Sequence, residues 1–396
     1  MMISRSQLRG TLALLLAVTI ACPPAQALVS LNDGHDHIYV NTSVGFGWDS
    51  NVYANSEAKG DYAMNTSVSA EYSRRAGWIG VNVGTTLVSS RFQDLKDENF
   101  DNPNINVELT KQTGRTTGSL TMSAVRSSRA DAAVNLRSTS WNYSTGLNFR
   151  YPVITIYTLT GQVGYSLVKY SGNSLFPDLA TYTASADLIR LFSTERDIML
   201  GYRYRHSETS VDTSNDDHAA TIGLSGKLIR GLNGSLRVGY QFRQPRGQYS
   251  AGHSPSTYSA WTASGSTTYA LNKRMNFTGT LGKDFSTTAT DTSVDTTTAA
   301  LDFQYAYSSH WSLSATISGG DTRFLGETGR LVLNTNPLVL GPNRHDNFVA
   351  ASVSINYSLN EHLKVAASYA WFKNWSTTPY ADFIRSSYNL NLSSRW

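Results

Sequence analysis

The stretch Trp141-Asn142-Tyr143-Ser144-Thr145-Gly146-Leu147-Asn148-Phe149-Arg150 decides the fold. Aromatic or aliphatic side chains stand at alternate positions, interrupted only by Thr145, and small or polar side chains stand between them. Alternation with a period of two places one set of side chains on each face of a β-strand. The same pattern recurs at residues 42–48, 236–243, 301–305, 311–317 and 353–357. The sequence therefore predicts an all-β protein.

The two faces of these segments differ in a way that a soluble sheet does not require. One face is continuously apolar, while the other carries Ser, Thr, Gly and Asn with some Arg and Asp. Such strands suit an outer face in lipid and an inner face on a water-filled lumen. Charged residues are 16% and hydrophobic residues 40% of the chain, against about 25% and about 45–50% in soluble domains. The low mean hydropathy excludes a bundle of membrane helices.

The connections between these segments alternate between short and long. Short ones include residues 74–77, 150–153, 230–233, 272–274 and 308–310, and longer polar ones cover 93–104, 127–137, 208–217, 244–256 and 321–346. Short periplasmic turns and long external loops are typical of outer-membrane barrels, whose sheets must close because no backbone group can stay unpaired in lipid. We therefore expect a transmembrane antiparallel up-and-down β-barrel in the bacterial outer membrane, with both termini periplasmic.

Counting the alternating segments gives about 18 strands, with 16 as the alternative, and such barrels have even numbers. The expected strands begin near Ile38, Asp61, Trp78, Asn104, Thr116, Ser138, Ile154, Ala180, Glu195, His218, Leu232, Thr257, Met275, Ser293, Trp311, Asp346, His362 and Tyr380. Aromatic residues gather near both ends of these segments, as two interfacial belts require.

The first 27 residues form a secretory signal peptide in this interpretation. Arg5 and Arg9 are its basic part, residues 11–21 are its apolar part, and Ala25-Gln26-Ala27 fits a cleavage site. A lipoprotein box ending at Cys22, the only cysteine, is the alternative. Cleavage would leave residues 28–37 as a short periplasmic segment and residues 38–396 as the barrel.

The C-terminus carries a second signal. Counting back by twos from Trp396 passes Ser394 and reaches Leu392, Leu390 and Tyr388. This segment resembles the C-terminal signal of bacterial outer-membrane barrels, with Trp in place of the commoner Phe. The resemblance implies that Tyr388, Leu390, Leu392 and Trp396 are read by the barrel assembly machinery.

The segment Gly45-Phe46-Gly47-Trp48-Asp49-Ser50-Asn51-Val52-Tyr53 resembles the start of the family called putative β-barrel porin 2. The resemblance implies an exit pore for an exopolysaccharide, with the polysaccharide as cargo and a periplasmic polysaccharide-export protein as partner. Uptake of solutes by a general or solute-specific porin is the alternative, and a surface adhesin or structural barrel is the second alternative. Outer-membrane lipid and lipopolysaccharide are further expected partners.

Basic residues fall on inward positions of several expected strands. They are Arg203, Arg205, Lys227, Arg237, Arg243 and Lys364, and the first five come from three consecutive strands. The inward acids Glu71, Glu108, Asp187 and Asp302 come from other sectors. This arrangement predicts pore-lining bases and a transverse field that favours anions. The alternative is a mixed-charge lumen that serves hydration.

The remaining candidates carry weaker signals. The apolar connection at residues 321–346 is the best candidate for a constriction loop inside the barrel. His35-Asp36-His37 and the pair Asp216-Asp217 are interpreted as a solvated tail and a solvated loop. We expect no catalytic residues, no metal site, no cofactor and no enzymatic activity. The formal charge of +4 is too small to indicate nucleic acid.

Overall fold

The computed structural model describes residues 29–31, 35–75, 77–131, 136–171, 176–247, 257–325 and 344–396. The expected signal peptide lies outside these residues. The strands are β1 (Val29–Leu31), β2 (Asp36–Asp49), β3 (Asp61–Arg74), β4 (Gly80–Phe92), β5 (Phe100–Lys111), β6 (Thr117–Asp131), β7 (Leu136–Ile154), β8 (Tyr157–Ser171), β9 (Leu179–Ser193), β10 (Arg196–Thr209), β11 (Thr213–Ile229), β12 (Leu232–Gly247), β13 (Tyr258–Asn272), β14 (Met275–Thr287), β15 (Ser293–Ala306), β16 (Trp311–Leu325), β17 (His345–Ser358), β18 (Leu363–Ser376) and β19 (Phe383–Arg395). Two short 3-10 helices, Lys96–Glu98 and Pro379–Ala381, lie in connections.

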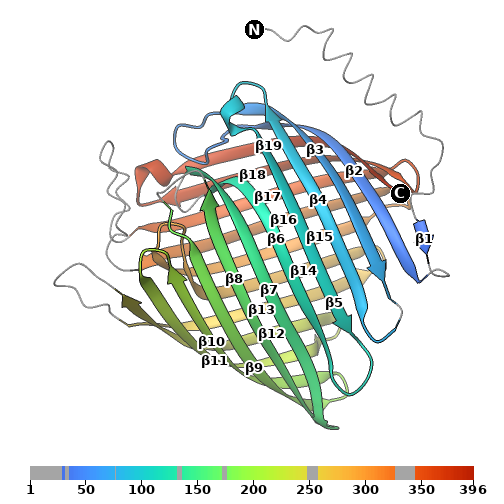
Figure 1. Cartoon of the computed structure of the whole chain (residues 1–396), viewed down its shortest axis with the longest axis vertical. Coiled ribbons are helices and arrows are strands. Elements are labelled where there is room, and N and C mark those ends of the chain that lie inside the picture. Colours follow the sequence, from blue (N-terminus) through green and yellow to red (C-terminus); the bar gives the residue numbers. More distant parts are fainter. Residues whose placement is uncertain are drawn as a thin grey trace.

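The strands β2 to β19 form a closed antiparallel barrel of 18 strands (Figure 1). Each strand pairs with its neighbours in sequence, and β19 pairs with β2 to close the wall. Closure leaves the wall without a free edge, as a sheet surrounded by lipid requires. Strand β1 lies outside this cycle, and within the described part of the chain its partner is β2. The predicted up-and-down barrel is confirmed.

The strand positions follow the alternation closely. Five strands begin at the expected residue: Asp61, Leu232, Met275, Ser293 and Trp311. The largest error is at β11, which begins at Thr213 rather than near His218. The expected long loop at residues 208–217 is therefore wrong, because β10 ends at Thr209 and the polar residues Ser214 to Asp217 continue the ladder. The expected solvated tail at residues 35–37 is also wrong, because β2 begins at Asp36, which faces Arg74.

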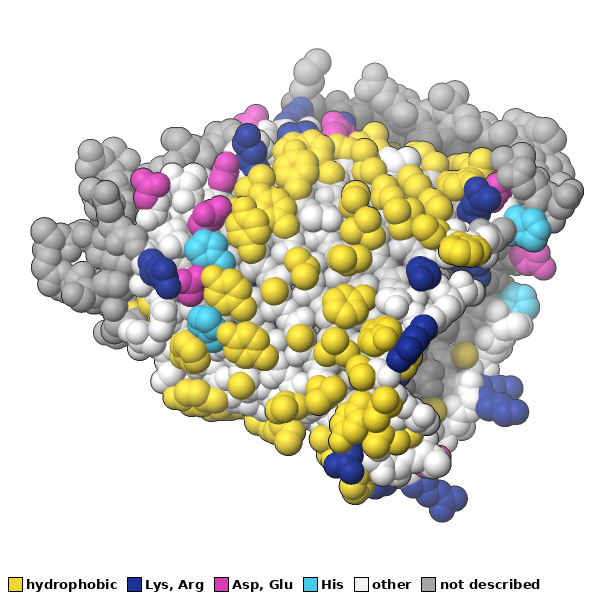
Figure 2. Space-filling model, turned by 60° about the horizontal axis from the view of Figure 1, so that its bottom comes forward, with side chains coloured by type: hydrophobic (Ala, Val, Ile, Leu, Met, Phe, Trp, Pro, Cys, Tyr) yellow, Lys and Arg dark blue, Asp and Glu magenta, His cyan; other side chains and the backbone are white. Residues whose placement is uncertain are grey.

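The outer wall exposes large apolar side chains at alternate positions. Leu200, Ile222 and Val238 are 61%, 57% and 54% exposed and lie on neighbouring strands. Figure 2 shows such side chains gathered over the middle of one face, with charged side chains mostly near its margins. Aromatic residues occur toward both ends, such as Trp311 beside a short turn and Trp375 at the opposite end of the wall. This distribution is that of a surface solvated by lipid in the middle and by water at its edges.

The described residues contain no helix that is both long enough and apolar enough to span a membrane.

Candidate functional site

Strands β14 and β15 leave the barrel wall at the end where residues 288–292 connect them, which is the side of the long connections (the loop side). The ladder between β13 and β14 stops at the pair Ala263–Lys283, although β14 continues to Thr287 and keeps its pairing with β15. Beyond this rung, the carbonyl oxygens of Phe285 and Ser286 accept hydrogen bonds from Arg205 of β10 and Arg243 of β12. Four strand spacings separate β10 from β14 along the wall, or about 19 Å, which is farther than an arginine side chain reaches. The end of this hairpin therefore folds into the lumen.

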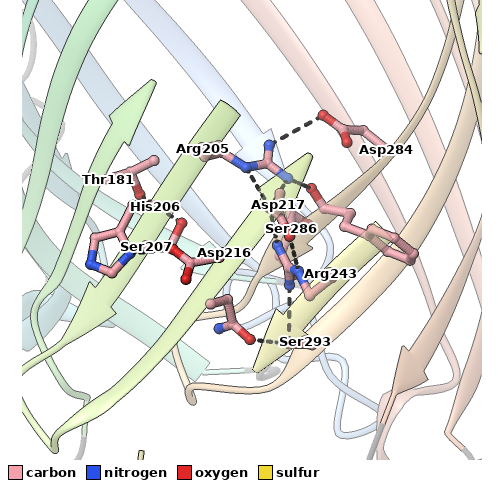
Figure 3. A network of polar contacts seen from close by, with 12 residues as sticks. Thr181, Arg205, His206, Ser207, Asp216, Asp217, Arg243, Asp284, Ser286 and Ser293 are labelled. Atoms are coloured by element: carbon pink, nitrogen blue, oxygen red, sulfur yellow. Dashed lines mark hydrogen bonds and ion pairs between the residues drawn. The ribbon is translucent and has the colours of Figure 1, made fainter. Parts of the chain in front are cut away.

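Two arginines and one aspartate hold the hairpin in place (Figure 3). Arg243 donates two hydrogen bonds to the Asp217 carboxylate, at 2.6 and 2.8 Å, and one to the Ser286 carbonyl at 2.7 Å. Arg205 donates to the same carboxylate at 2.7 Å and to the Phe285 carbonyl at 2.5 Å. Arg243 and Asp217 have exposed side-chain fractions of 0% and 1%. These buried charges are compensated by one another and by backbone carbonyls, as buried ions require.

The tip of the hairpin, residues 288–292, reaches other strands. The Thr213 hydroxyl at the start of β11 donates to the Asp291 carboxylate at 2.5 Å. Ala289 packs against Phe176 in the β8–β9 connection, with Tyr170 beside them. Burial raises the pKa of the Asp291 carboxyl, against the opposing effect of the hydroxyls of Thr213 and Thr209. The tip therefore crosses part of the barrel mouth.

A polar cavity of about 530 Å³ lies beneath the hairpin. Its lining includes Asp187, Arg203, Arg237 and Asp284, from β9, β10, β12 and β14. Arg203 pairs with Asp284 at 2.7 Å and Arg237 with Asp187 at 2.6 Å. The two arginine side chains keep 31% and 32% of their surface exposed. Each can therefore donate to a solute as well as to its aspartate.

Four of the six predicted pore-lining bases meet in this one sector. Arg203, Arg205, Arg237 and Arg243 reach across to non-adjacent strands, which is possible only on the concave side of the wall. Their role in a pore stays a prediction. The expectation that inward acids lie in other sectors is wrong for Asp187, which pairs with Arg237. Asp217 and Asp284 also join the arginines.

The other two predicted bases lie apart from this cluster. Lys227 sits at a β-bulge next to the β11–β12 turn and pairs with Glu195 at 3.0 Å. Lys364 is exposed near the start of β18, opposite Ser358 and Ser393. The predicted constriction loop cannot be located, because residues 326–343 lie outside the described residues. No group of three or more His, Cys, Asp or Glu among the described residues is placed to hold a metal ion.

The segment predicted as the assembly signal forms the closing seam. Tyr388, Leu390 and Leu392 on β19 pair with Trp48, Phe46 and Val44 on β2. Tyr388 and Leu390 are 54% and 55% exposed on the outer face. The backbone of Trp396 exchanges two hydrogen bonds with Val40, and its ring stacks on His362.

The inward end of the β14–β15 hairpin is not among the predicted features, although the sequence carries one signal for it. Between Ser286 and Thr298 the chain reads Ser-Thr-Thr-Ala-Thr-Asp-Thr-Ser-Val-Asp-Thr-Thr-Thr, which is polar at nearly every position. A strand with one face in lipid alternates, so loss of alternation over the ends of two adjacent strands indicates that neither face meets lipid. This pattern could have located the hairpin.

A closed barrel of this size with an apolar exterior and a charged interior is the architecture of bacterial outer-membrane porins. Among solved structures, OccK2 (OpdF) of Pseudomonas aeruginosa matches 92% of this chain and 98% of its own, with 12% identity and a TM-score of 0.50. OpdK of Pseudomonas aeruginosa, solved with vanillate, covers 91% of this chain and 99% of its own at 12% identity and a TM-score of 0.48. OccAB2 of Acinetobacter baumannii covers 93% and 99%, also at 12% and 0.48.

The similarity to OccK2 shows a shared fold, and these structures are those of porins rather than enzymes. No family model and no curated protein matches the chain. The resemblance of residues 45–53 to the exopolysaccharide-associated family is therefore not confirmed.

Proposed function

We propose that the protein is an outer-membrane channel for the uptake of a small anionic solute. The observation that carries this proposal is the arginine-lined cavity beneath the inward hairpin. Its volume of about 530 Å³ lies in the range of sites for small molecules. The same proposal places the termini and the short turns on the periplasmic side, as in barrels of this kind.

The charge of the cluster favours an anion. Four guanidinium groups, from Arg203, Arg205, Arg237 and Arg243, face three carboxylates, from Asp187, Asp217 and Asp284. Arg243 is fully buried and engaged with the hairpin, so it is not available to a solute. The part-exposed Arg203 and Arg237 are the groups that would donate to a carboxylate, and charge-assisted contacts of this kind are the strong ones.

The hairpin is also the reason to prefer uptake over polymer export. Its backbone is held by buried arginines, and its tip contacts β11 and the β8–β9 connection. An exit pore for a polysaccharide chain would need this hairpin to swing away against those contacts. A small solute needs only the space beside it.

Solute entry into proteoliposomes tests the proposal. We expect gluconate to enter faster than the similarly sized cation glucosamine, and we expect Arg203→Gln with Arg237→Gln to remove that preference. Lys227→Gln, which removes a charge near a turn outside the cluster, should leave the preference unchanged. Equal rates for both solutes in the wild type would overturn the anion proposal, and passage of a dextran would favour the exit pore.

A further inference from the structure

The outer face of the wall carries a patch of bases near the loop side of β4 to β8, strands that lie side by side (Figure 1). We define the basic patch as Arg91, Asp101, Arg126, Trp141 and Lys169. Trp141 stands directly opposite Arg126 on β6 and opposite Lys169 on β8. The Arg126 guanidinium donates to the Asp101 backbone carbonyl at 3.2 Å, which brings Arg91 and Asp101 next to this row.

Residue alternation places the patch on the outer wall. Trp141 lies at an odd-numbered position of β7, and so do Tyr143 and Leu147, which are 40% and 49% exposed. Residues of the same parity, odd or even, lie on the same face of a strand. Lys169 shares parity with Val163, which is 56% exposed, and Arg126 with Met122, which is 47% exposed. Outward residues of β7 from Val153 to Trp141 span roughly 30 Å at a rise of about 3.3 Å and a tilt of about 40°. The patch therefore lies at the upper edge of the apolar band, at headgroup level.

Within the described part of the chain, two of the three bases of the patch have no acid beside them. Arg91 pairs with Asp101 at 2.7 Å, but neither Arg126 nor Lys169 has a carboxylate within 4.0 Å among the described residues. The Arg126 Nε atom is buried without a hydrogen-bond partner. Asp178, the acid nearest to Lys169 along the chain, accepts the backbone N–H of Tyr170 at 3.0 Å.

The outer wall across the barrel shows the opposite arrangement. Its loop-side bases are paired with acids: Arg246 with Asp216, Arg323 with Asp321 and Lys373 with Asp382. A surface of paired charges offers little to an added anion. The basic patch therefore differs from the opposite wall because Arg126 and Lys169 carry positive charge that no neighbouring carboxylate of the described residues neutralises.

We propose that the basic patch docks a lipid with a phosphorylated headgroup, such as lipopolysaccharide. Acyl chains would lie along the exposed apolar residues Met122, Tyr143 and Val163 below, and phosphate oxygens would accept hydrogen bonds from Arg126 and Lys169. Juxtamembrane bases attract anionic headgroups in this way, and a Trp at this level suits the interface. The proposal does not depend on what the lumen transports.

Native mass spectrometry of the detergent-solubilised full barrel, titrated with lipid A, tests the proposal. Arg126→Gln with Lys169→Gln should weaken lipid A binding by about tenfold or more. Arg323→Gln with Lys373→Gln removes the same charge from the wall of paired bases and should leave binding unchanged. Heat-modifiable migration in gels verifies that each variant is folded.

Two further arms separate the alternatives. Lipid A without its phosphates should bind weakly, and equally strong binding would overturn the proposal in favour of acyl packing alone. Inorganic phosphate should fail to displace lipid A, since displacement at low concentration would show a site for the free ion. Equal affinity of the two double variants would also reject the basic patch as the docking surface.

Discussion

At the scale of single residues, Arg243 is a buried charge that binds both the barrel wall and the β14–β15 hairpin. Its side chain is fully buried and binds Asp217 through two nitrogens, while a third contact holds the Ser286 carbonyl. Removing one partner of a buried ion pair leaves the other charge uncompensated, which costs several kcal/mol. Arg205 would soften this loss, because it also binds Asp217.

We therefore expect Arg243→Leu to lower the free energy of unfolding by about 3 kcal/mol. Single-channel conductance should rise as well, because the Ser286 end of the hairpin is released. Arg246→Leu, at a side chain 66% exposed on the outer wall, should cost less than about 1 kcal/mol. Urea unfolding in lipid vesicles, followed by tryptophan fluorescence, measures both variants. An equal loss for the two would contradict the structural role of the buried pair.

Asp291 makes the docking of the hairpin tip depend on pH. Because burial raises the pKa of this carboxyl, the docked state favours its protonated form. Docking is therefore strongest at pH values below those at which an ordinary aspartate titrates. It weakens as the pH rises through the ordinary aspartate pKa and then through the raised pKa of Asp291.

Conductance should accordingly increase as pH rises through this window. Asp291→Asn keeps a neutral side chain of the same shape and should hold the low-pH conductance at every pH. Planar-bilayer recordings across the window provide the measurement. A pH response that survives in Asp291→Asn would assign the effect to another group.

At the scale of elements, the strands were predictable and the inward hairpin was not. Alternation identified β3, β12, β14, β15 and β16 at their first residues because lipid on one side and water on the other impose a strict period of two. Where a segment meets water on both faces, that constraint disappears. For this reason Asp217, on β11, was taken for a loop residue, and its pairing with two arginines could not be foreseen.

The arginine cluster shows the same limit. The sequence placed Arg203, Arg205, Arg237 and Arg243 on inward positions, since parity alone decides the face. Asp284, the partner of Arg203 and Arg205, reaches them through the bend of β14 beyond Lys283, which brings together residues that a regular wall keeps apart. Parity therefore predicts which way a side chain points, while contacts across the lumen require the path of the chain.

Shortening the β14–β15 hairpin tests it as a constricting element. Replacing residues 285–295 by Asn-Gly joins Asp284 directly to its ladder partner Thr296 through a two-residue turn. We expect a folded barrel with larger conductance, because the backbone that Arg205 and Arg243 hold in the lumen is gone. Unchanged conductance in a heat-modifiable, folded variant would show that the narrowest point lies elsewhere.

At the scale of the whole molecule, closure depends on the seam between β19 and β2. Nine rungs join the strands, from Ser387–Asp49 to Arg395–Asn41, and Trp396 adds its backbone bonds to Val40. Deleting Arg395 and Trp396 removes the last rung and the ring that stacks on His362. We expect this deletion to abolish membrane assembly, as measured by the heat-modifiable form in isolated outer membranes. Trp396→Phe should assemble normally, and normal levels of the deletion variant would refute the signal.

The points at which neighbouring ladders stop also report on the surroundings of the barrel. The β13–β14 ladder ends at Ala263–Lys283, and the β5–β6 ladder ends at Asn104–Val125 although β6 continues to Asp131. A backbone group can leave its strand partner only where water or a polar side chain replaces it. These two rungs therefore serve as depth marks. Amide protons that point across these two ladders should exchange slowly below the rungs, and those on the same strand edges above the rungs should exchange quickly. The boundary should trace the surface of the membrane independently of any side chain.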